Sequence, residues 1–164
     1  MDLRTRRTIR SAIEIRAPLD SVWDVLTDFS AYPEWNPHIR RVRGTPRVGG
    51  RLTIRSEPPA GRPVVLRPMV TRWDPPTELR WRGTFVSRLL FSGEHGFKLE
   101  PLAGDRVRFL QDETFSGLLV PLYARLRLHK TRAGFTQMNE SLRERVERLA
   151  AGTQSENDRS AVAF

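Results

Sequence analysis

Apolar and charged side chains alternate with a period of two through most of residues 77–115, and this pattern limits the fold more than any other feature of the chain. In one such segment Leu79, Trp81 and Phe85 fall on one face, and the charged residues between them fall on the other. A period of two is typical of a β-strand. Because one face is charged, we expect antiparallel strands in a sheet that is wetted on one side.

Seven segments are predicted to be strands, with glycine- and proline-containing turns between them. They are residues 8–16, 39–45, 50–57, 63–73, 77–86, 90–100 and 105–115. A short helix over residues 19–27 is expected after the first strand. Residues 28–37 contain two prolines, so they are expected to form a loop or one further helical turn.

The last predicted element is an amphipathic helix over residues 119–150. Its apolar stripe changes phase between Leu126 and Phe135, so we expect a bend or a change of buried face there. Seven antiparallel strands must curl to bury their apolar face, and this helix is the only element able to fill the concave side. One helix rarely fills such a space by itself, so the order of elements predicts an apolar cavity beside it.

The length of 164 residues fits one domain, which we assign to residues 1–150, and the small polar residues of 151–164 predict a disordered tail. Cysteine is absent and the three histidines lie far apart, so we expect no metal site and no cofactor. No apolar run reaches the roughly 18–20 residues that a membrane span needs. The basic start of the chain lacks a continuous apolar segment, so we read no secretory signal and expect a cytoplasmic protein.

The formal net charge of +9 raises nucleic acid as a partner. Arginine supplies 26 of the 28 basic residues, which fits codon bias in a GC-rich genome as well as selection for phosphate contacts. The excess is concentrated in residues 40–82, where eleven arginines and three acidic residues give +8. Strand parity places most of these arginines on the wetted face of the sheet, so the pattern disfavours nucleic acid.

The apolar face of the predicted sheet and the stripe of the last helix supply candidate ligand-binding residues. They are Trp81, Phe85, Phe97, Phe109 and Met138. Under any interpretation most of them belong to the core, and their parity alone does not separate residues that face a cavity from residues that fill the interior.

Residues 32–37 combine two aromatic side chains with two prolines and have two open interpretations. Tyr32 and Trp35 could form one lip of the cavity on a loop that the prolines stiffen. Alternatively, Trp35 caps the core and the prolines only shape a turn.

Three polar residues, His95, Gln111 and Glu113, share the parity of the apolar face. They could hydrogen-bond a carbonyl or hydroxyl of a ligand, and His95 and Glu113 are the candidate catalytic residues if protons are transferred. An unpartnered buried carboxylate is costly, so the interpretation that we favour for Glu113 is a local slip in parity that brings it to the surface or against an arginine. For His95 the alternative is a histidine that bonds a backbone carbonyl.

Three motifs together carry a resemblance to a known family: APLDSVWDVLTDFSAYPEWNPHI at residues 17–39, VTRWDPP at 70–76 and ETFSG at 113–117. Over residues 8–148 the chain resembles the START-like, helix-grip (SRPBCC) superfamily, and within it the bacterial polyketide cyclase/dehydrase and lipid-transport branch. The resemblance implies an α+β fold in which a curved seven-stranded antiparallel sheet wraps around a long C-terminal helix, with two short helices after the first strand. It also implies a cavity for a hydrophobic ligand, but it does not define a reaction.

Three functions from different classes follow from these observations. The one we favour is a carrier or sensor of a hydrophobic small molecule such as a lipid, an isoprenoid or a polyketide-like compound. The second is an aromatase/cyclase or dehydratase that uses His95, Glu113, Tyr32 and Arg80 on a poly-β-ketone. The third is a module that binds an acidic partner through residues 40–82. The sequence leaves open whether the protein forms a homodimer.

Overall fold

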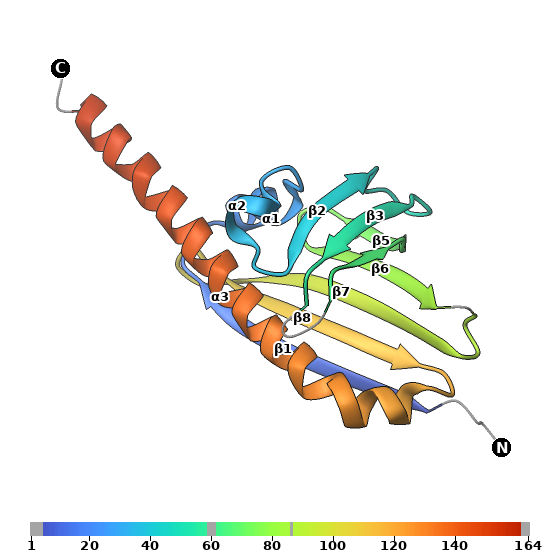
Figure 1. The fold of residues 1–164 in the computed structure, drawn as a ribbon. Coiled ribbons are helices and arrows are strands. Elements are labelled where there is room, and N and C mark those ends of the chain that lie inside the picture. The colour runs from blue at the N-terminus through green and yellow to red at the C-terminus, as the bar shows by residue number, and fades with distance from the viewer. Residues whose placement is uncertain (1–4, 59–61, 86, 162–164) are drawn as a thin grey trace.

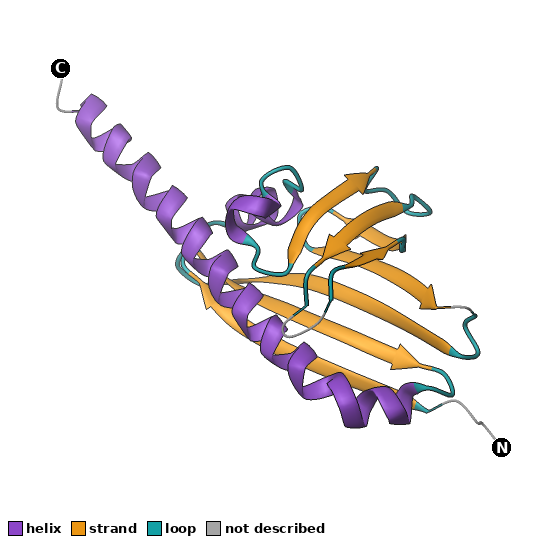
Figure 2. Cartoon of the chain, in the orientation of Figure 1, coloured by secondary structure: helices purple, strands orange, loops and turns teal. Residues whose placement is uncertain are grey.

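The computed structural model describes residues 5–58, 62–85 and 87–161, with the backbone alone for residues 153–161. Figure 1 and Figure 2 show a twisted antiparallel sheet, a smaller sheet beside it and a long helix lying across the larger sheet. The strands are β1 (Arg6–Ile15), β2 (Ile39–Gly44), β3 (Leu52–Ser56), β4 (Val64–Leu66), β5 (Met69–Asp74), β6 (Glu78–Phe85), β7 (Phe91–Leu102) and β8 (Arg106–Ser116). The helices are α1 (Leu19–Thr27), α2 (Tyr32–Trp35) and α3 (Val120–Ala161).

The strands form two sheets, a five-stranded one in the order β1-β8-β7-β6-β5 and a three-stranded one in the order β2-β3-β4. The predicted α+β helix-grip fold is confirmed, including the two short helices after the first strand, but the prediction of one seven-stranded sheet is wrong in detail. The segment 63–73 is divided at Pro68 into β4 and β5, which belong to different sheets. Proline has no N–H for a ladder, so it suits the point where the chain leaves one sheet for the other.

The two sheets remain joined near that crossing. The backbone N–H of Gly49 donates to the carbonyl of Val70 at 2.9 Å, and the N–H of Val70 donates to the carbonyl of Gly50 at 2.8 Å. Leu52 donates in the same way to Pro68 at 2.9 Å. The smaller sheet is therefore held against the edge strand β5 and folds over the concave side of the larger one (Figure 1).

Helix α3 packs its buried stripe against the concave face of the five-stranded sheet. Leu142 and Val146 lie in the main core cluster with Phe97 and Phe109, and all four are almost completely buried. The helix continues to Ala161, well past the predicted helix end at residue 150, and residues 162–164 lie outside the described part. The division into one domain over residues 1–150 and a disordered tail stays a prediction.

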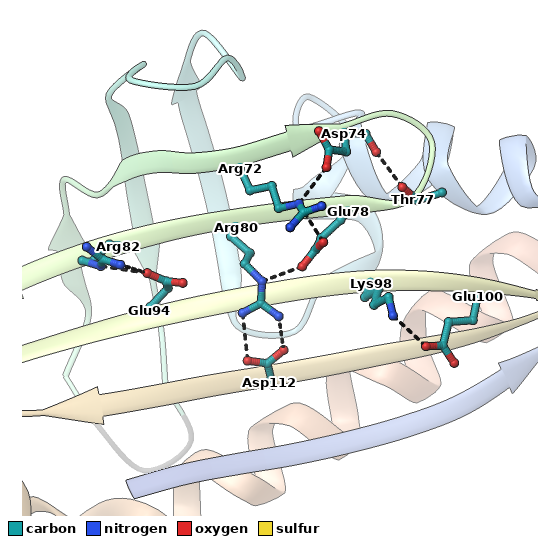
Figure 3. Close-up of polar contacts among 10 residues, drawn as sticks. All are labelled: Arg72, Asp74, Thr77, Glu78, Arg80, Arg82, Glu94, Lys98, Glu100 and Asp112. Carbon is teal, nitrogen blue, oxygen red and sulfur yellow. Dashed lines mark hydrogen bonds and ion pairs between the residues drawn. The ribbon is translucent and has the colours of Figure 1, made fainter. Parts of the chain in front are cut away.

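The outer face of the five-stranded sheet carries a network of ion pairs, drawn in Figure 3. Arg80 is at its centre: its guanidinium donates to both carboxylate oxygens of Asp112 at 3.0 and 2.8 Å, and its Nε donates to Glu78 at 2.6 Å. The hydrogen bond to Asp112, followed by that to Glu78, outweighs partial burial and raises the pKa of Arg80 above its usual range. Arg72 pairs with Glu78 at 2.8 Å, and Arg82 pairs with Glu94.

This network determines how much of the basic block at residues 40–82 is free. Arg72, Arg80 and Arg82 are all engaged by acidic residues of the same sheet face. Arg80 therefore lies on the convex side, away from the concave face, and is not available to a ligand held inside the fold.

Candidate functional site

A cavity of about 860 Å³ lies between the concave face of the five-stranded sheet, the smaller sheet and helix α3. Side chains from all three of these parts line it. The lining residues are His38, Ile39, Ile54, Ser56, Pro58, Arg62, Val64, Leu66, Trp81, His95, Gln111, Glu113, Tyr123, Arg127, Lys130, Thr131, Gly134, Phe135 and Met138. The cavity that the order of elements predicted is therefore present, with β2, β3 and β4 as a wall that we did not foresee.

An aromatic surface forms part of the wall that the larger sheet contributes. Trp81 on β6 pairs in register with His95 on β7, and their rings stack with centroids 5.5 Å apart and planes 14° apart. Phe135 of α3 meets the imidazole edge-on, with ring centroids 5.0 Å apart. Flat apolar faces of this kind suit the body of a hydrophobic ligand.

A short polar relay runs along this aromatic surface. The amide nitrogen of Gln111 lies 3.1 Å from Nε2 of His95 and also contacts the sulfur of Met138 at 3.4 Å. On the other side of the ring, Nδ1 of His95 lies 3.5 Å from a carboxylate oxygen of Glu113. In a neutral imidazole one nitrogen donates and the other accepts. With the amide N–H toward Nε2, a neutral imidazole has its proton on Nδ1, the nitrogen that faces the carboxylate.

Glu113 lies on the inner face, so the favoured interpretation of a slip in parity is wrong. Strand β8 keeps its alternation through Glu113, which pairs in register with His95. The carboxylate has room there because Gly93 lies beneath it: a Cβ at position 93 would come within 2.8 Å of Oε1 of Glu113. The partner that offsets the cost of this half-buried charge is the histidine on the next strand rather than an arginine.

Helix α3 contributes polar and cationic groups that the sequence analysis did not single out. Tyr123 and Thr131 share a hydrogen bond of 2.6 Å between their hydroxyls. Burial, with a smaller contribution from the negative charge of Glu113, raises the pKa of Tyr123 above its usual value. Arg127 and Lys130 also line the cavity. The spacing of three and four residues that links Arg127 and Thr131 to Met138 was a signal that could have revealed this face.

Of the nine predicted ligand-binding residues, Trp81, His95, Gln111 and Met138 line the cavity. The other five do not. Phe97 and Phe109 are fully buried in the core, because parity selects the inner face without distinguishing positions that α3 and α1 cover. Phe85 shares the face of Trp81 but lies at the end of β6, where its side chain is 66% exposed.

Tyr32 and Trp35 pack in the core instead of forming a lip. Their rings are 4.9 Å apart, and the hydroxyl of Tyr32 donates to the carbonyl of Leu26 at 2.7 Å. Neither residue reaches the cavity. Of the two open interpretations, the structure supports the one in which Trp35 caps the core.

The described part of the chain contains neither a cluster of metal ligands nor a membrane-spanning helix. Within residues 5–58, 62–85 and 87–152, whose side chains are described, no three His, Asp or Glu side chains gather in a way that could hold a metal ion. In the same part of the chain, no helix combines the length and the hydropathy required to span a membrane.

The fold and the cavity agree with a family comparison. Residues 6–152 match the family described as polyketide cyclase / dehydrase and lipid transport. The chain belongs to this family. No curated protein matches the chain in sequence.

Solved structures with the same fold come from bacteria and plants. The Zhui aromatase/cyclase from Streptomyces sp. R1128 superposes with a TM-score of 0.72 at 14% identity, covering 88% of this chain and 95% of its own. Norcoclaurine synthase from Thalictrum flavum gives a TM-score of 0.69 at 14% identity, with 90% and 98% covered. A START superfamily protein from Mycobacterium smegmatis gives 0.66 at 24% identity, with 87% and 98% covered. At these identities the likeness establishes the fold, and function is argued from the site.

Proposed function

We propose that this chain is a cytoplasmic bacterial protein that binds a hydrophobic small molecule in the cavity and acts as its carrier or sensor. The observation that carries the proposal is the cavity itself, with about 860 Å³ between the two sheets and α3. That volume falls within the range of small-molecule sites, roughly 300–1,000 Å³. The family description, which includes lipid transport, supports the same function.

The lining suggests which chemical class of ligand fits. Trp81, Phe135, Ile54 and Met138 offer apolar surface from both sheets and from α3. The polar groups gather around Glu113, and they could orient one hydroxyl or carbonyl of the ligand. A mostly apolar molecule with few oxygen atoms, such as a lipid, an isoprenoid or a polyketide-like compound, matches this distribution.

A cavity-filling variant tests this function. Arg127, Thr131, Gly134 and Met138 follow a spacing of three and four along α3 and all line the cavity, so a side chain at position 134 enters it. We expect Gly134→Leu to weaken binding of the apolar dye N-phenyl-1-naphthylamine at least about tenfold, since it occupies ligand space. The matched control is Ala133→Leu on the exposed side of the same helix.

The expected results separate binding from folding. Both leucine variants should melt at or above the temperature of the wild type, because leucine favours a helix more than glycine does and about as much as alanine. Native mass spectrometry of the purified wild type should also release an apolar species on organic extraction. Equal dye affinity of Gly134→Leu, Ala133→Leu and wild type would show that the cavity is not the binding site.

A second candidate function is catalysis, and the pair of His95 and Glu113 favours it. A histidine and a carboxylate in contact at 3.5 Å inside a cavity are groups that can move protons in a cyclisation or dehydration of a polyketide-like substrate. We expect Glu113→Gln to lower turnover of a poly-β-ketone at least about a hundredfold if this chemistry occurs, with dye binding unchanged. Equal turnover of Glu113→Gln and wild type would exclude catalysis by this pair, and the carrier function would then be the one that remains.

A third candidate, a module for an acidic partner, has less support. Three arginines of the basic block already pair with acidic residues on the outer face of the sheet (Figure 3). This candidate would gain support if the protein bound single-stranded nucleic acid at low ionic strength and the affinity decreased steeply as salt is added.

A further inference from the structure

One end of the molecule exposes large apolar side chains that the fold does not cover. We call this group the leucine end; its members come from the β6–β7 hairpin and the start of α3. They are Phe85, Leu89, Leu118, Leu119, Leu122 and Leu126. Exposed apolar residues that lie together, unlike scattered single ones, indicate a surface that contacts something else.

These residues are held next to one another by the backbone. The N–H of Leu118 donates to the carbonyl of Leu89 at 3.0 Å, which ties the start of α3 to the β6–β7 turn. Leu122 and Leu126 are four residues apart on α3, so they lie on one face of the helix, and Leu118 lies in the turn just before it. The leucine end is therefore one patch built from two segments that are distant in the sequence.

The first turns of α3 have an apolar outer face as well as an apolar inner face. Val120 and Phe135 point inward and are buried, whereas Leu122 and Leu126 are 58% and 55% exposed. The phase change that the sequence shows in the apolar stripe between Leu126 and Phe135 therefore separates an exposed row from a buried one. The solvent side of a surface helix is normally polar, so the exposed row is not explained by folding alone.

Basic residues accompany the leucine end along the chain, and the segment that holds most of them contains no acidic residue. Residues 114–139 contain four basic residues and no Asp or Glu. Arg125 and Arg132 follow the leucine row on α3, and Arg88 lies beside Leu89 in the β6–β7 turn. Within the described part of the chain, none of these three arginines forms an ion pair.

The leucine end and the cavity share one stretch of helix. Tyr123, Arg127 and Lys130 line the cavity, and they alternate along α3 with the exposed Leu122 and Leu126. A surface that receives the leucine row would therefore lie against the same helical turns that form one wall of the cavity.

We propose that the leucine end docks on an anionic lipid membrane, with the leucines in the interfacial region and the arginines among the headgroups. Apolar side chains flanked by Lys and Arg are what an interfacial helix presents to such a surface. A second copy of this chain fits less well, because two equally cationic rims would face each other across the contact. The biological purpose of docking rests on the proposed carrier function, since docking would bring the wall of the cavity to the lipid from which a ligand could be taken.

Vesicle flotation with three variants tests the docking. We expect the wild type to float with vesicles of phosphatidylcholine and phosphatidylglycerol in equal parts, and to bind less as salt is added. Leu122→Ser with Leu126→Ser should lower the partition coefficient at least about tenfold, because it removes apolar contact area. Arg125→Gln with Arg132→Gln should lower it by a similar factor on mixed vesicles and leave binding to pure phosphatidylcholine unchanged. Val48→Ser, at an exposed valine outside the leucine end, is the matched control and should bind as the wild type does.

The outcomes distinguish docking from ligand binding. Absence of wild-type binding to the mixed vesicles overturns the proposal. A dimer in solution that Leu122→Ser with Leu126→Ser dissociates, without vesicle binding, also overturns it and identifies a second copy as the occupant. Dye binding to the cavity is measured separately: vesicle binding without dye binding supports docking while it refutes the carrier function.

Discussion

Replacement of Arg80 tests whether the ion-pair network on the outer face stabilises the sheet. Arg80 makes three charged hydrogen bonds, two to Asp112 and one to Glu78, and its side chain is only 24% exposed. Arg80→Met keeps the apolar part of the side chain, removes the arginine that pairs with Asp112 and leaves Glu78 paired with Arg72 alone. Removal of one partner from a fully buried pair costs about 3–5 kcal/mol, so with partial exposure we expect a loss of about 2–4 kcal/mol in the free energy of unfolding.

The control for this prediction is on the same sheet face. Arg72 pairs with Asp74 and Glu78, but its own side chain is 54% exposed, and Glu78 keeps Arg80 as a partner when Arg72 is replaced. We expect Arg72→Met to cost about 0–1 kcal/mol. In a chain of this size the loss expected for Arg80→Met corresponds to a melting temperature lower by about 4–16 °C, measured by calorimetry, and urea unfolding gives the free energies directly.

A double-mutant cycle with Asp112→Asn completes the assay. Because Arg80 and Asp112 share two hydrogen bonds, the two substitutions together should cost clearly less than the sum of the single losses. The reasoning is refuted if Arg80→Met is no more costly than Arg72→Met, or if the cycle is additive.

Three further predictions concern the interior. Gly93→Ala should displace the carboxylate of Glu113, since its Oε1 would be 2.8 Å from the new Cβ, and should thereby change the nitrogen NMR signals of His95. The stability cost should stay below about 1 kcal/mol. Gly83→Ala is the control, because a Cβ there meets nothing within 4 Å, and it should leave the His95 signals unchanged. Leu142→Ala, at a fully buried position of α3, should destabilise the protein by about 2–5 kcal/mol in urea unfolding, and a loss under 1 kcal/mol would contradict the packing of α3 on the sheet. Burial raises the pKa of both tyrosines of the chain, so the stability that they contribute is full below the unfolded pKa of about 10 and is lost as the pH rises through their folded pKa values. Absorbance at alkaline pH should therefore show phenolate only together with unfolding. Phenolate in the folded protein near pH 10 would refute this prediction.

The alternation of β6, β7 and β8 made the inner wall of the site predictable. It placed Trp81, His95 and Gln111 on one face, and the register of three adjacent strands then brings them together. Parity also holds at Glu113, where the favoured interpretation was a slip: the residue keeps the inner face, and Gly93 on β7 gives its carboxylate room. The space for the Glu113 carboxylate depends on which residues of β7 lie next to it. The alternation within one strand does not reveal how that strand is aligned with its neighbour.

The opposite wall could not be predicted from alternation. β4 has only three residues, Val64–Leu66, all exposed to some extent, so it carries no alternation of burial. Its role as a wall follows from the crossing at Pro68, which assigns it to the smaller sheet. Tyr32 and Trp35 were predicted to line the cavity but lie in the core. Their local motif is conspicuous in the sequence, but its position relative to the sheet is fixed by tertiary packing.

The length of α3 has a practical consequence for attaching probes to this protein. From Leu122 to Ala161 the helix advances about 60 Å at the usual rise per residue. Figure 1 shows that it points away from both sheets in its last turns, while β1 begins near the start of α3. A fluorophore or surface anchor attached at the carboxyl end would therefore leave the leucine end unobstructed, whereas one fused ahead of Arg6 would lie close to it. Energy transfer from a carboxyl-terminal dye to labelled lipid would then report whether the helix stands upright on a bilayer or lies along it.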